Sequence, residues 1–74
     1  MAFAMAGTTL GSELERVRLE HRAERIERVL DQMRTLAGRH ADGVPAPLRN
    51  GIGDFSRELS GVRRRLRELQ EHAR

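Results

Sequence analysis

Apolar residues recur at alternating intervals of four and three through the last third of the chain. They are Leu48, Ile52, Phe55, Leu59, Val62, Leu66, Leu69 and Ala73. This heptad spacing is typical of a helix that buries one narrow stripe against another helix. We therefore predict a helix over residues 47–73, with Pro47 in its first turn. Gly51 and Gly53 are unfavourable within a helix, so Asp54 is an alternative N-cap and start.

An earlier stretch carries a second stripe with the same spacing. Its members are Leu19, Ala23, Ile26, Leu30, Met33 and Ala37. Ser12 and Glu15 fit a capping box at the start of a helix, and Gly38 fits a stop at its end. The pattern predicts a helix over residues 13–37. The preceding residues 1–11 carry no charge, and we expect them to form an apolar segment that is flexible when unbound.

A short loop is expected between these two helices, over residues 38–46. Asp42–Gly43 is a strong turn dipeptide, and Pro45 disfavours a helical conformation at the residue before it. Two striped helices joined by so short a loop fold back on each other. The expected fold is an all-α antiparallel two-helix hairpin over residues 12–74, with Ile26 near Leu59.

Helix 13–37 carries apolar residues that such a hairpin leaves uncovered. Leu10, Leu14, Val17 and His21 lie nearly opposite the stripe at about 100° per residue, and Val29 and Leu36 flank it. A chain of 74 residues without cysteine has little core and no disulfide to stabilise it. We therefore expect a homo-oligomer, self-associated into a four-helix bundle, in which these six residues bind a second copy or another protein.

Positive charge is concentrated in the second predicted helix. The chain has a net charge of +3, with 14 Arg, no Lys and 11 acidic residues. Helix 13–37 is neutral, so residues 47–74 hold the whole excess. Candidate phosphate contacts lie away from the stripe at Arg49, Arg57, Arg63, Arg64 and Arg67. The alternative function is therefore a nucleic-acid-binding hairpin, although a solvated charged face is the simpler interpretation.

The remaining residues do not indicate catalysis or a cofactor. The sequence lacks Cys, Tyr and a Gly-rich phosphate loop, so we expect no enzyme activity and no cofactor. Neither of the pairs His21–Glu24 and Glu68–His72 faces the stripes, so no metal site is expected. No apolar run is long enough for a transmembrane helix, and no signal peptide is recognisable. We expect a cytoplasmic interaction module such as an adaptor, docking or assembly subunit. Contact of the apolar N-terminal residues with a lipid surface is a further alternative.

Overall fold

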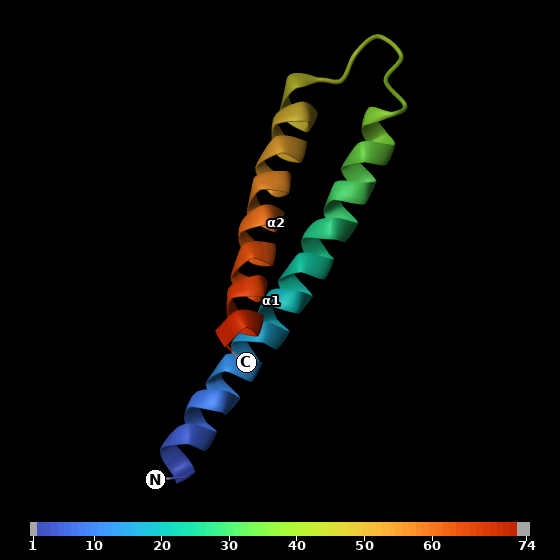
Figure 1. Cartoon of the computed structure of the whole chain (residues 1–74). Coiled ribbons are helices and arrows are strands. Elements are labelled where there is room, and N and C mark those ends of the chain that lie inside the picture. The colour runs from blue at the N-terminus through green and yellow to red at the C-terminus, as the bar shows by residue number, and fades with distance from the viewer. Residues whose placement is uncertain (1, 73–74) are drawn as a thin grey trace.

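The computed structural model describes the backbone of residues 2–72 and the side chains of residues 10–71. Two helices, α1 (Ala2–Ala37) and α2 (Ala46–His72), lie side by side and are joined by a loop at one end (Figure 1). The all-helical hairpin expected from the two stripes is confirmed. No helix in the described part of the chain is long and apolar enough to cross a membrane.

Helix α1 begins much earlier than the capping box suggests. It starts at Ala2, so Ser12 and Glu15 lie inside the helix and the expected start near residue 13 is wrong. Alanine has the highest helix propensity, and the alternating Ala residues near the N-terminus favour continuation through Gly7 and Gly11. Whether residues 1–11 are flexible when unbound stays a prediction, and residue 1 lies outside the described backbone.

The C-terminal end of α1 falls at Ala37, as expected. The Gly38 N–H donates to the Arg34 carbonyl at 3.0 Å, and the Arg39 N–H donates to the Leu36 carbonyl at 3.1 Å in a tighter turn. Gly38 does not use the left-handed conformation that a glycine stop usually provides. The residue with a positive φ is instead Gly43 in the loop, where a φ of 110° suits the turn and favours glycine.

Helix α2 begins at Ala46, which excludes Asp54 as its start. The Pro45 carbonyl accepts the first helical hydrogen bond from the Arg49 N–H at 3.0 Å. Gly51 lies inside α2, where the flexible end of the Met33 side chain of α1 packs against it. A Cβ atom at Gly51 would lie 2.9 Å from the Met33 Cε. The predicted end at residue 73 lies outside the described residues.

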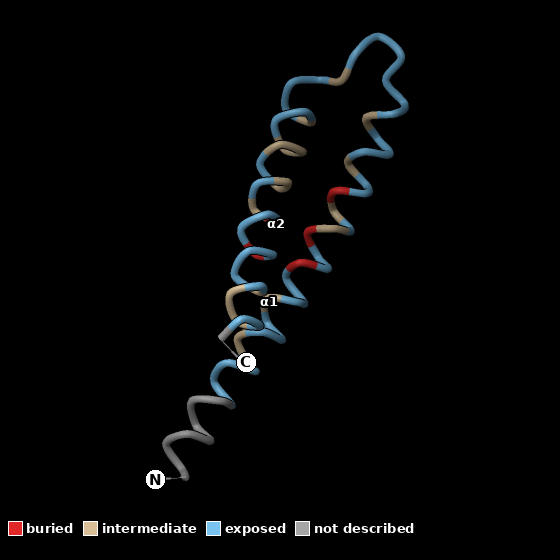
Figure 2. Tube along the Cα trace, viewed as in Figure 1, coloured by how far each residue is buried: buried red, intermediate tan, exposed pale blue. Residues whose placement is uncertain are grey.

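The core runs along the facing sides of the two helices (Figure 2). Its buried members are Ala23, Ile26, Leu30, Leu59 and Val62, with Leu19, Ile52, Phe55 and Leu66 packed against them. All nine belong to the two predicted stripes. Leu30 is the most deeply buried, with 1% of its surface exposed. The phase of each helix therefore agrees with the heptad spacing.

The two helices differ in length, and the difference leaves part of α1 unpaired. α1 has 36 residues and α2 has 27. The N-terminal turns of α1 project beyond the end of α2, giving a molecule about 63 Å long and 17 × 15 Å across (Figure 1). This projecting part carries the first residues of the candidate binding surface.

Candidate partner-binding surface

Four of the predicted binding residues share one side of α1, which we call the outer face: Leu10, Leu14, Val17 and His21. Their spacing of four, three and four places them on one side of a helix. Leu10 is 57% exposed, Leu14 50% and Val17 41%. His21 is also exposed. Three large apolar side chains in succession on one helix face are typical of a contact surface.

Helix α2 does not cover the outer face, for two reasons. It packs on the side of α1 that carries Ala23, Ile26 and Leu30, which is nearly opposite at about 100° per residue. It also ends before the N-terminal turns of α1, which project beyond it (Figure 1). The exposure of these apolar residues therefore follows from the phase and the length of the two helices.

Val29 and Leu36, also predicted to bind a partner, lie elsewhere. Val29 is partly buried next to Leu30, and Leu36 is 47% exposed near the loop. Leu36 is 19 positions after Val17, which corresponds to about 28 Å along the helix. The structure thus groups four of the six predicted residues and leaves these two outside the outer face.

Exposed ion pairs connect the two helices beside the core. Arg22 donates to Glu58 at 2.5 Å, and Arg63 donates to Glu27 at 2.6 Å. Sequence reasoning missed these pairs. The signal that could have identified them is that each pair places opposite charges next to stripe residues that face each other in the hairpin.

Arg65 makes the most extensive of these contacts, and it was not among the predicted residues. Its guanidinium donates to Glu15 on α1 at 3.0 Å and to Glu68 on its own helix at 3.3 Å. The hydrogen bond to Glu15, followed by the one to Glu68, raises the pKa of Arg65 above its ordinary value. Arg65 therefore connects α2 to α1 at Glu15, the residue that follows Leu14 of the outer face.

Two of the five candidate phosphate contacts are already engaged. Arg57 pairs with Asp54 on the same helix, and Arg63 pairs with Glu27 across the hairpin. The other three, Arg49, Arg64 and Arg67, are exposed and form no ion pair with the described residues. The predicted basic stripe is therefore reduced to three unpaired cations spread over about 27 Å of α2.

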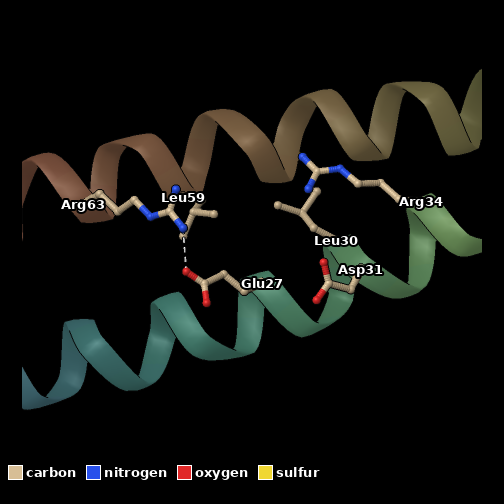
Figure 3. A pocket seen from close by; sticks show the side chains of 6 residues that line it. All are labelled: Glu27, Leu30, Asp31, Arg34, Leu59 and Arg63. Atoms are coloured by element: carbon tan, nitrogen blue, oxygen red, sulfur yellow. Dashed lines mark hydrogen bonds and ion pairs between the residues drawn. The ribbon is translucent and has the colours of Figure 1, made fainter.

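A shallow groove lies between the helices (Figure 3). Its volume is about 320 Å³, and it is lined by Glu27, Leu30, Asp31, Arg34, Leu59 and Arg63. The two acidic and two basic side chains balance, and Arg63 reaches from α2 to Glu27. The groove therefore presents no net charge to a ligand. No group of three potential metal ligands occurs in the described part of the chain.

No known protein family, curated protein or solved structure matches this chain. Its functional interpretation rests on the surface described above.

Proposed function

We propose that this protein is a non-enzymatic protein–protein interaction module that acts through the outer face of α1. A second copy of the chain or another protein covers this face, as in an adaptor, docking or assembly subunit. The observation that carries this proposal is the exposure of Leu10, Leu14 and Val17 on one side of a helix whose opposite side is buried.

Burial of these three residues would be favourable in any complex. Each is about half exposed, so covering it contributes on the order of 1 kcal/mol. The hairpin itself has only a short core centred on Ile26, Leu30 and Leu59. A small domain with so little core gains stability when a partner covers a second apolar face. Self-association would extend the hairpin into an assembly of four helices.

A sedimentation experiment over the micromolar range tests this function. The native chain should form a dimer or larger species, and the double variant Leu14→Ser, Val17→Ser should shift towards the monomer. Leu36→Ser is the matched control, because Leu36 is similarly exposed but lies outside the outer face. Circular dichroism should show that all variants remain helical. A native chain that stays monomeric throughout, or a control as disruptive as the double variant, would contradict the proposal.

The unpaired cations support nucleic-acid binding as a second candidate function. Arg49, Arg64 and Arg67 point to phosphate contacts because no acidic side chain among the described residues neutralises them. Duplex RNA or DNA binding through three phosphates should weaken with salt at a log–log slope of about −2 to −3. Replacing the three Arg by Gln should remove that dependence. Binding to a protein through the apolar outer face should depend on salt less steeply than this.

A further inference from the structure

We propose that the occupant of the outer face is a second copy of this chain, aligned parallel and in register along α1. This inference rests on the proposed function and specifies the partner and its orientation. It follows from the charged residues that border the outer face, which distinguish between the two possible directions of a paired helix.

The outer face has the heptad spacing of a coiled-coil seam. Leu10 and Val17 occupy d positions, and Leu14 and His21 occupy a positions. These are the positions that meet the neighbouring helix in a coiled coil. The residues at e and g flank the seam on either side and set which partner and which orientation are favourable.

The flanking positions carry opposite charges on opposite sides. The g positions hold Glu13 and Glu20, and the e positions hold Arg18 and Arg25. In a parallel pair, each g residue meets the e residue five positions later on the other helix, so Glu13 meets Arg18 and Glu20 meets Arg25. In an antiparallel pair, g meets g and e meets e, which brings Glu against Glu and Arg against Arg. The charges therefore favour the parallel orientation.

These flanking charges are available for a partner. Glu13, Arg18 and Arg25 form no ion pair with the described residues. Glu20 has one contact within the helix, to Arg16 at 3.7 Å. All four side chains are exposed.

Other charged residues of α1 serve the hairpin instead. Glu15, Arg22 and Glu27 border the buried stripe, and each pairs with a residue of α2. Over residues 10–25, α1 thus carries two separate sets of charges, one for each apolar face; Glu27 is the next g position after Glu20, but it lies beyond His21 and pairs with Arg63. The set beside the outer face is the one that lacks partners across a helix interface.

The sequence also limits the length of the paired segment. Glu24 and Arg28 occupy the next d and a positions, where each would face the same charge on the second copy. Pairing therefore ends after His21. Since α2 lies on the opposite side of α1, it does not obstruct the second copy. The assembly would place the two α1 helices at its centre and one α2 on each outer side, which is a row of four helices rather than a closed bundle.

Disulfide trapping tests the orientation directly, because the native chain has no cysteine. The variants Leu10→Cys and His21→Cys are oxidised separately and as an equimolar mixture, and the products are identified by intact mass. A parallel, in-register pair predicts that each variant forms its own symmetric dimer and that the mixture yields few hybrids. Hybrids that join position 10 to position 21 as the main product would show an antiparallel pair and overturn this inference. Self-association, and with it the proposed function, would still stand.

Charge reversal tests the cause of that orientation. Glu13→Arg, Glu20→Arg makes both flanks basic, and Arg18→Glu, Arg25→Glu makes both flanks acidic. Each variant alone should dimerise about tenfold or more weakly than the native chain, and an equimolar mixture should recover. The variant with all four changes is the matched control, because it exchanges the two flanks and keeps every parallel pair complementary.

The outcomes separate the two proposals. Native-like dimerisation of the variant with all four changes supports a parallel pair. Unchanged dimerisation of both double variants, the one with basic flanks and the one with acidic flanks, would overturn it. A native chain that neither dimerises nor forms either symmetric disulfide would overturn both this inference and the self-association proposed above. Circular dichroism should show that every variant remains helical, since the substituted positions are exposed.

Discussion

Replacing Leu30 by Ala tests whether the stability of the hairpin depends on the stripes or on helix propensity. Leu30 is 1% exposed, so the change removes a completely buried isobutyl group. Buried Leu-to-Ala changes cost about 2–5 kcal/mol, and the larger values belong to sealed cavities. Leu30 also lines the open groove of about 320 Å³, so the vacated space would connect to solvent. We therefore expect a loss of about 2–3 kcal/mol, at the lower end of that range.

Urea unfolding followed by circular dichroism measures this loss, with all variants at one low protein concentration. A 74-residue domain at about 0.05–0.15 kcal/mol per residue has about 4–11 kcal/mol of stability, so Leu30→Ala should remain folded. Its Tm should fall by about 10–20 °C. Leu36→Ala is the matched control, because it makes the same chemical change on the same helix at a residue that is 47% exposed. Equal losses for the two variants would refute the assigned helical phase.

The same unfolding assay checks three further predictions. Gly61→Ala should raise the free energy of unfolding by up to about 1 kcal/mol, since a Cβ atom at Gly61 meets no atom within 4 Å. Gly43→Ala, in contrast, should lower the free energy of unfolding by about 1 kcal/mol or more, because the φ angle of Gly43 is 110°. A double-mutant cycle of Arg63→Ala and Glu27→Ala should give a coupling below about 1 kcal/mol that shrinks with salt, because both side chains are largely exposed. Arg57→Ala should change stability by less than about 0.5 kcal/mol, since this side chain is 76% exposed and contacts only its own helix; a larger loss would indicate a packing role for it.

The spacing of apolar residues was sufficient to predict the hairpin. A stripe that alternates by four and three fixes the buried side of a helix wherever the helix begins, because the side-chain direction repeats with the helical period. Ile26 and Leu59 therefore lie in the core as expected. The position of the loop followed from Gly38, Asp42–Gly43 and Pro45, which are strong local signals.

The helix starts were less predictable because several local signals competed. Ser12 and Glu15 match the capping-box pattern, but the helix already runs from Ala2, so Ser12 lies in its interior and does not cap it. Asp54 followed two glycines and looked like a start, yet α2 runs through both glycines and the end of the Met33 side chain lies against Gly51. That contact joins residues 18 positions apart, so local propensity around Gly51 could not indicate it.

The candidate site was predictable only in part, for a similar reason. The outer-face positions followed from the helical phase, whereas the availability of charges depended on pairing between helices. Arg57 and Arg63 looked equivalent to Arg64 in the sequence, but both are paired in the structure and Arg64 is not. The Arg57–Asp54 pair has a three-residue spacing that the sequence of α2 already contains. The Arg63–Glu27 pair depends instead on the register of the two helices, which a helical wheel of one helix does not contain.

The two helices differ in how many neighbours they require. The apolar residues of α2 from Ile52 to Leu66 all fall on one side, and α1 covers that side. On α1 the apolar residues fall on two nearly opposite sides, so a single neighbour leaves one side in water. A helix with apolar residues on opposite sides is satisfied only between two neighbours. α2 supplies the first, and Leu10, Leu14 and Val17 stay exposed on the other side. We propose that the second neighbour comes from another chain, because the loop after Ala37 returns α2 to the side that is already buried.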